Sequence, residues 1–142
     1  MFDNAITHLG LGEIIWKASG GSSFYCMLST DTNQPDQTND LHRGDFTECT
    51  TQNGYTANGA GPMTLVDAST PSSHYITFDA NDIAWSTFSY VDVRFAIPYV
   101  NAGTYPLWSY HDFGKTTGGG GTFTVVWHAT NGIARILVTT GA

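Results

Sequence analysis

The sequence predicts an all-β fold, an antiparallel β-sandwich or jelly-roll-like domain preceded by a short N-terminal helix or arm. From Met63 onward, short runs rich in β-branched and aromatic residues alternate with clusters of Gly, Pro, Asn, Asp and Ser, a pattern typical of sandwiches and barrels. The connections are too brief for parallel crossovers, so the strands should pair antiparallel. At 142 residues the chain has the length of one domain, which we divide into a helix or arm over 1–21 and a β-sandwich over 22–142.

The N-terminal segment carries apolar residues at helical spacing, which predicts a short amphipathic helix over about 3–9. Its apolar side chains exceed what so short a helix needs for packing, and they are Phe2, Ile6, Leu9, Ile14, Ile15 and Trp16. An arm that orders on docking would bury them against a partner. The alternative is that the helix caps one open end of the sandwich.

Alternation of apolar and polar residues predicts the strands that follow. A short aromatic-rich run predicts a buried strand over Ser22–Ser29, and Leu41–Cys49 is compatible with a helical turn. Further strands are predicted at about 63–68, 74–79, 89–97, 106–112, 122–128 and 133–138. The last of these is apolar on both faces, which favours a central position in a sheet.

Two turns should join the last three predicted strands. The run TTGGGG at Thr116–Gly121 consists largely of residues free to adopt positive φ, and Asn131-Gly132 is a strong hairpin signal. On this basis we expect the last three strands to pair antiparallel with one another.

Composition restricts the classes of partner. Charged residues make up 12% of the chain, about half of the roughly 25% usual in soluble domains. The net charge of -7 opposes binding to a phosphate backbone, so we expect no free nucleic acid as partner. No apolar run is long enough for a membrane span, and the N-terminus has no secretory pattern.

The two cysteines do not form a disulfide framework. Cys26 lies in the apolar run FYCML, where a buried reduced thiol is the expected state. A disulfide with Cys49 is the alternative, which a cytosolic folding compartment would disfavour.

Motifs for catalysis, cofactors and metals are each incomplete. Gly114-Lys115-Thr116 resembles the end of a phosphate loop, but Ser109 stands where that motif requires glycine. A calcium loop starting at Asp31 would need glycine and glutamate where Asp36 and His42 stand. His111 and His128 could face each other across strands and hold a metal, although ordinary sheet positions are favoured. We therefore expect a protein that is not an enzyme, with no catalytic residue, cofactor or metal.

Aromatic residues are the most distinctive feature of the composition, with four Trp, seven Tyr and eight Phe. Trp85 and Trp127 are expected in the core. Trp108 and Tyr110 share one face of a predicted strand and are candidates for an exposed interface or a glycan platform. Arg94 lies opposite the apolar face of its strand, so we expect a surface ion pair or a contact between subunits.

The order of sequence motifs resembles a known family. FYCMLST, GYTANGAGPMTL, ITFDANDIAWS, VDVRFAIPYV, PLWSYHDFG, GTFTVVW and NGIARI follow one another over residues 22–138. This arrangement is similar to that of small virion structural proteins of tailed bacteriophages. GYTANG, DANDIAW, YPLWSYHDFG and GTFTVVW are the most distinctive pieces. In this pattern Tyr55 would anchor a loop whose turns are permitted by Gly54, Gly59 and Gly61.

The resemblance implies a non-enzymatic virion protein that is made in the host cytoplasm. The first expectation is a capsid decoration or cement protein on the head surface, bound to the major capsid protein and to copies of itself, trimers first. The alternative is a neck- or tail-associated protein or a head-fibre module that binds a host surface glycan. The contacting residues would be Phe2, Ile6, Leu9, Ile14, Trp16, Arg94, Trp108 and Tyr110.

Overall fold

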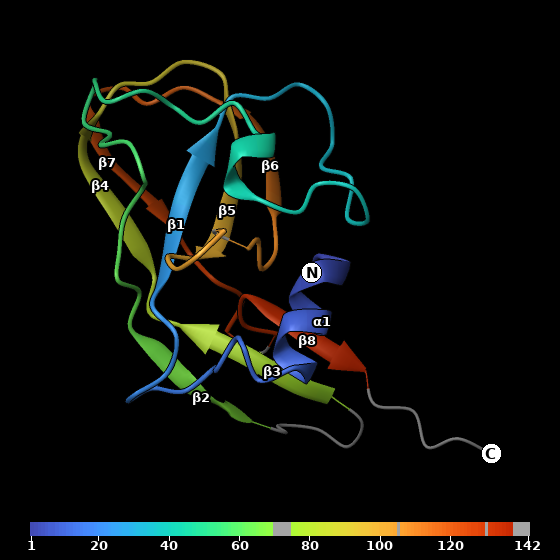
Figure 1. Cartoon of the computed structure of the whole chain (residues 1–142). Helices are drawn as coiled ribbons and strands as arrows, with labels where there is room; N and C mark the ends of the chain where they lie inside the picture. The colour runs from blue at the N-terminus through green and yellow to red at the C-terminus, as the bar shows by residue number, and fades with distance from the viewer. Residues whose placement is uncertain (70–74, 105, 130, 138–142) are drawn as a thin grey trace.

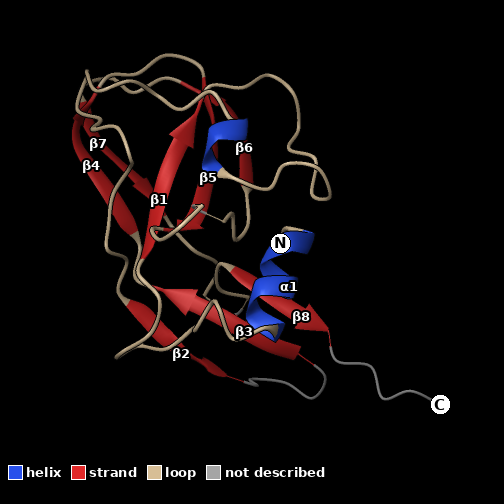
Figure 2. Ribbon diagram, viewed as in Figure 1, coloured by secondary structure: helices blue, strands red, loops and turns tan. Residues whose placement is uncertain are grey.

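The fold is all-β and antiparallel, with one short α-helix at the N-terminus, as the sequence predicts (Figures 1 and 2). The computed structural model describes residues 1–69, 75–104, 106–129 and 131–137. Helix α1 spans Asp3–Gly10, and a short 3-10 helix spans Arg43–Asp45 within the segment where a helical turn is expected. Two of the elements, β1 and β5, stand upright in the middle of the molecule in Figure 1.

The described strands form three sheets. The first has the order β1-β5-β6 and consists of Phe24–Ser29, Val93–Val100 and His111–Thr116. The second has the order β2-β3-β8 and consists of Leu65–Ser69, Tyr75–Ala80 and Ala134–Leu137. The third pairs β4, Ile83–Phe88, with β7, Gly121–Val125.

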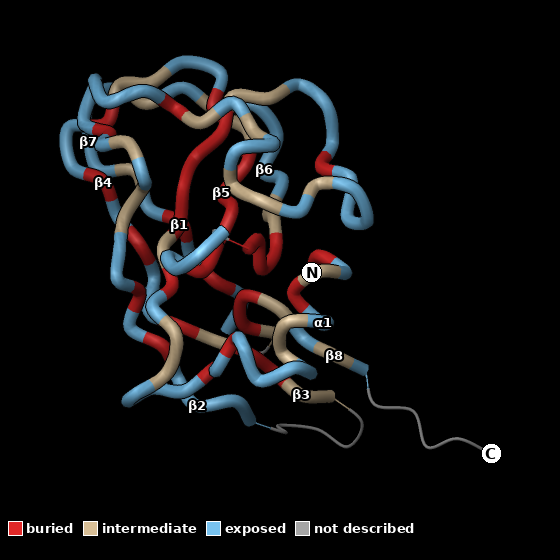
Figure 3. Tube along the Cα trace, in the orientation of Figure 1, coloured by how far each residue is buried: buried red, intermediate tan, exposed pale blue. Residues whose placement is uncertain are grey.

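Four aromatic rings form the centre of the core. Trp16 stacks on Trp108 with ring centroids 5.0 Å apart. Phe24 of β1 lies 4.7 Å from Trp16, and Phe78 of β3 lies 5.0 Å from Trp108. All four are buried, so this aromatic cluster joins the N-terminal segment to two of the sheets. Figure 3 shows that β1 and β5 are buried along most of their course.

The N-terminal segment is part of the domain and does not stand apart as an arm. Phe2, Ala5, Ile14 and Trp16 are all buried within the chain. The Phe2 N–H donates to the Trp108 carbonyl oxygen over 3.0 Å. A division at residue 21 therefore cuts through the core, and the capping alternative describes this segment better than the docking arm.

Most predicted strands are present, but two segments differ. The predicted strand 106–112 is displaced, because β6 begins at His111 and Leu107 and Trp108 are fully buried in the preceding segment. That segment still bonds to β5, since the Trp108 N–H donates to the Pro98 carbonyl oxygen over 2.9 Å. Strand β4, Ile83–Phe88, lies between the strands predicted at 74–79 and 89–97, where the sequence pattern predicts none. Residues 74 and 138 of the predicted strands lie outside the described residues.

The predicted pairing of the last three strands is wrong. β6 pairs with β5, β7 with β4, and β8 with β3. The glycine-rich turn bonds elsewhere, because Gly118 N–H donates to Tyr90 O (2.8 Å) and Gly120 N–H to Phe88 O (2.9 Å). The turn therefore packs against the end of β4 and the connection between β4 and β5. As a result β6 and β7, which flank the turn, pair with different strands. β8 is an edge strand, since it ends the order β2-β3-β8 among the described strands.

The glycine-rich segment GYTANGAG fixes a loop against β1. The Tyr55 hydroxyl donates to Glu48 Oε1 over 2.7 Å and accepts the Leu28 N–H over 3.2 Å. Burial, together with this bond to Glu48, raises the pKa of Tyr55. Gly54 and Gly59 have φ of 82° and 72°, so the anchoring role expected of Tyr55 and the turns expected at these two glycines are confirmed.

Gly59→Ala should be far more damaging than Gly20→Ala. Both glycines have positive φ, which costs a residue with a Cβ about 1–2 kcal/mol. A Cβ at Gly59 would also lie 1.9 Å from the Cys26 carbonyl oxygen, whereas one at Gly20 meets nothing within 4 Å. We expect a loss above about 4 kcal/mol at Gly59 and about 1–2 kcal/mol at Gly20, measured by chemical denaturation. Equal losses would contradict the close approach.

Trp16→Phe should cost more stability than Trp108→Phe. The Trp16 indole N–H donates to the Val66 carbonyl oxygen over 2.8 Å. The indole N–H of Trp108 is buried and has no acceptor among the described residues. Losing a hydrogen bond costs about 1 kcal/mol, whereas removing an unpaired donor does not carry that cost. Urea unfolding of both variants should show the difference, and a larger loss at Trp108 would contradict this assignment.

Candidate functional site

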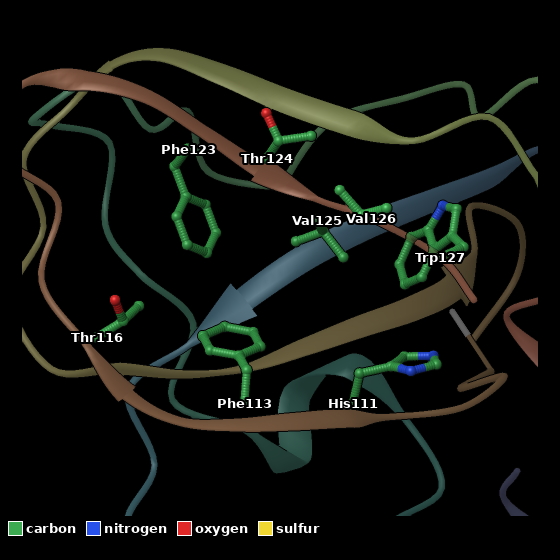
Figure 4. Close-up of a pocket in the computed structure, with 8 residues that line it drawn as sticks. All are labelled: His111, Phe113, Thr116, Phe123, Thr124, Val125, Val126 and Trp127. Atoms are coloured by element: carbon green, nitrogen blue, oxygen red, sulfur yellow. The ribbon is translucent and has the colours of Figure 1, made fainter. Parts of the chain in front are cut away.

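An open groove lies between β6 and β7. It has a volume of about 310 Å³ and is lined by His111, Phe113, Thr116, Phe123, Thr124, Val125, Val126 and Trp127 (Figure 4). Figure 4 shows His111 and Phe113 projecting from β6 toward Phe123, Val125 and Trp127. The groove is thus built from side chains of two strands that do not pair with each other.

Alternation along β7 produces the groove wall. Val125 and Trp127 are buried and Phe123 is half-buried, while Thr122, Thr124 and Val126 are exposed. Since successive side chains of a strand point to opposite faces, the apolar set faces the groove and the other set faces solvent. Val126 is 70% exposed, an unusual exposure for an aliphatic side chain.

Two ring contacts connect the strands across the groove. The rings of Phe113 and Phe123 have centroids 5.7 Å apart, and those of His111 and Trp127 are 5.0 Å apart. Offset ring pairs at such separations are attractive by about 0.5–1.5 kcal/mol. These contacts hold β6 and β7 together without backbone pairing, and Phe113 stays 38% exposed.

His111 is neutral at physiological pH. Burial first, and then the positive N-terminal amino group, lower its pKa to about 4, while a hydrogen bond involving Ile133 acts in the opposite direction. Its Nε2 lies 3.3 Å from the Ser109 hydroxyl. The groove lining is therefore uncharged, which suits contact with apolar or neutral surfaces.

The charges near the groove are paired along β6. Arg94 holds Asp112 through two nitrogens, with Nε 3.1 Å from Oδ1 and Nη2 2.8 Å from Oδ2. The hydrogen bond from Arg94 lowers the pKa of Asp112, and the same bond raises the pKa of Arg94. Lys115 Nζ lies 3.6 Å from Asp92 Oδ2. Of the two expectations for Arg94, the structure shows the surface ion pair.

Several residues expected at a partner surface are buried instead. Phe2 and Trp108 are completely inaccessible, and Ile14 and Trp16 are buried in the core. The exposure predicted for Trp108 is wrong because its ring packs between Trp16 and Phe78. These four side chains cannot meet a partner in this fold.

The remaining candidates are partly accessible. Ile6 is 48% exposed and Leu9 is half-buried. Tyr110 is also half-buried, with its ring 5.7 Å from Phe2 and its hydroxyl accepting from Gln34 Nε2 over 2.8 Å. Exposed apolar residues that the sequence did not single out include Leu11, Val126 and Phe113. The sequence VVW could have indicated the exposure of Val126, because alternation along a strand places one of two adjacent valines on the solvent side.

The cysteines are buried free thiols, as expected for Cys26. Desolvation raises the pKa of both, that of Cys49 to about 12. Both are therefore protonated and poor nucleophiles at neutral pH. Trp85 and Trp127 are buried, as predicted. Within the described residues there is no group of three or more His, Cys, Asp or Glu side chains arranged to hold a metal ion.

Neither helix in the described part of the chain has the length and apolar character needed to span a bilayer. No protein-family model, curated protein or solved structure matches the chain.

His111→Phe should weaken the dependence of stability on pH. Between pH 6.5 and about 4 the unfolded chain binds a proton at His111 that the folded chain does not. The free energy of unfolding therefore falls as the pH drops through this window. Urea unfolding at pH 7 and pH 5 should show a smaller fall in the variant than in the native chain. An unchanged pH dependence would show that His111 is readily protonated in the fold.

Proposed function

We propose that this chain is a non-enzymatic structural protein of a tailed-bacteriophage virion, most simply a decoration or cement protein that binds the major capsid protein on the head. The observation that carries the proposal is the uncharged groove between β6 and β7, with exposed Phe113 and Val126 beside it. Cores of protein–protein interfaces are depleted in charge and enriched in aromatic residues. The resemblance of the sequence motifs to virion proteins is the reason for proposing a bacteriophage virion as the location.

A sandwich or jelly-roll-like arrangement is part of this proposal. The Phe113–Phe123 contact joins the sheet β1-β5-β6 to the pair β4-β7 through side chains rather than backbone bonds. Packing through side chains from facing strands is how two layers of a sandwich meet. Such a body would present loops and strand edges to neighbouring subunits.

The capsid contact is proposed on the exposed part of the N-terminal segment. Ile6, Leu11 and Ile15 are 48%, 67% and 50% exposed, although Phe2, Ile14 and Trp16 of this segment are buried. Binding only to the assembled head would stabilise the particle by mass action. Copies of the chain and the major capsid protein are the proposed partners, and the virion head is the proposed location.

A saccharide-binding module is the second candidate, at a head fibre, neck or tail. The groove combines the aromatic rings of Phe113, Phe123 and Trp127 with the hydroxyl of Thr116, groups that suit a sugar face and its hydroxyls. Trp108 cannot take part in such a platform because it is buried. A saccharide-dependent change in Trp fluorescence would support this candidate over the first.

The double variant Leu11→Asp/Ile15→Asp should bind heads at least about tenfold more weakly, because two carboxylates would be desolvated at an apolar contact. Removing residues 1–21 would not test this, since it deletes buried core residues. The matched control is Val91→Asp, at a side chain 61% exposed outside the N-terminal segment. The measurement is saturation binding to heads lacking the protein, with cryo-electron microscopy locating it.

Native protein that fails to bind heads would overturn the head assignment. If cryo-electron microscopy locates the protein on the neck or tail, its position in the virion changes and the structural role stands. If the double variant saturates heads with native affinity, the N-terminal contact is wrong.

A further inference from the structure

β7 is an unprotected edge strand in the described part of the chain. It pairs with β4 on one side and with no other described segment. The outer side of β4 is covered, because Ser89 N–H donates to the Asn53 carbonyl oxygen over 2.9 Å and Gly54 packs against the carbonyls of Ser86 and Thr87. The open side of the β4–β7 pair is thus the β7 edge.

β6, the neighbouring edge, is blunted by several features. Its pairing with β5 is irregular between Val93 and Phe95, and Gly114 has a φ of 69°. Asp112 and Lys115 add charged side chains to it. Bulges and charges are the usual means by which proteins keep edge strands from pairing. β7, with the sequence GTFTV, has neither charge nor proline.

We propose that β7 pairs with β7 of a second copy of this chain, antiparallel about a two-fold axis between the two Thr124 residues. In this register Val126 of one copy lies opposite Thr122 of the other, on the outward face. On the groove face Phe123 lies opposite Val125 of the other copy. Cross-strand pairs of threonine or apolar residues are each favourable by up to about 1 kcal/mol.

Charge favours a second copy at this particular edge. Each chain carries a net charge of -7, so copies repel unless uncharged surfaces meet. The outward side chains Thr122, Thr124 and Val126 are exposed and neutral. Antiparallel pairing of a strand with itself is self-complementary about a two-fold axis, which gives a closed dimer.

The groove explains why the added strand lies beside β7 and not between β6 and β7. The Phe113–Phe123 and His111–Trp127 ring contacts bridge the two strands, so a further backbone segment has no room to pair between them. A strand added at the outer edge instead extends the groove face of β7. The second copy's Phe123 and Val125 would then cover the open side, where Phe113 is 38% exposed.

This inference deepens the proposed assembly role by naming one partner, and its test uses the free protein without particles. Sedimentation velocity over a concentration series should show a monomer–dimer equilibrium for the native chain. Thr124→Lys and Thr124→Glu should each raise the dimer dissociation constant at least about tenfold, because like charges would face each other across the axis. Mixing the two variants in equal parts should restore dimers, since opposite charges then face each other.

The matched controls are Val91→Lys and Val91→Glu, at a side chain that is 61% exposed and does not belong to β7. Alone or mixed, they should dimerise like the native chain. A Thr124→Cys variant treated with oxidised glutathione should give a disulfide-linked dimer, whereas Val91→Cys should not. The native thiols do not compete because Cys26 and Cys49 are buried.

A native chain that stays monomeric or forms trimers would overturn the proposal. So would Thr124→Lys that dimerises like the native chain, or a charge-reversed mixture that stays monomeric. Loss of head binding by Leu11→Asp/Ile15→Asp with dimers retained separates the two surfaces. Dimers that form with no affinity for heads would reject the head assignment and leave the β7 contact intact.

Discussion

The stacking of Trp16 on Trp108 is the contact on which the rest of the fold depends. Phe24 belongs to the sheet β1-β5-β6 and Phe78 to the sheet β2-β3-β8, and both rings pack against this pair. Each aromatic pair adds about 0.5–1.5 kcal/mol beyond the burial of its area. The cluster therefore holds two sheets and the N-terminal segment together, which is why that segment cannot act as a detachable arm.

Two glycine-containing segments determine that the free edge of the β4–β7 pair is β7. The GYTANGAG loop is fixed by Tyr55 and Glu48 and covers the outer side of β4. The turn at 117–120 bonds to the connection between β4 and β5, so β6 and β7 stay apart although they follow each other in sequence. Local turn chemistry alone favours a hairpin here, and the bonds to residues 88 and 90 override it.

Local sequence patterns were sufficient for the fold class and most strands, and insufficient for their partners. The alternation around Phe95 and Phe123 fixes which side chains share a face, because that follows from the period of a strand. Pairing of β7 with β4 depends on contacts far apart in sequence, which no local pattern encodes. Trp108 shows the same limit, because its burial depends on Trp16, more than ninety residues earlier, packing beside it. The groove was missed for this reason, since its two walls come from strands that do not pair.

An uncharged edge strand is a hazard in most proteins, because it pairs with any extended chain. Here the acidic surface restricts that hazard. With a net charge of -7, two copies meet at low electrostatic cost only where both surfaces are neutral, and the β7 edge is short enough to accept one strand in one register. Repulsion elsewhere would thus select a single orientation while backbone pairing supplies the affinity. The low content of charge and the exposed neutral strand, which separately are weak signals, are together the basis for the proposed pairing of two copies.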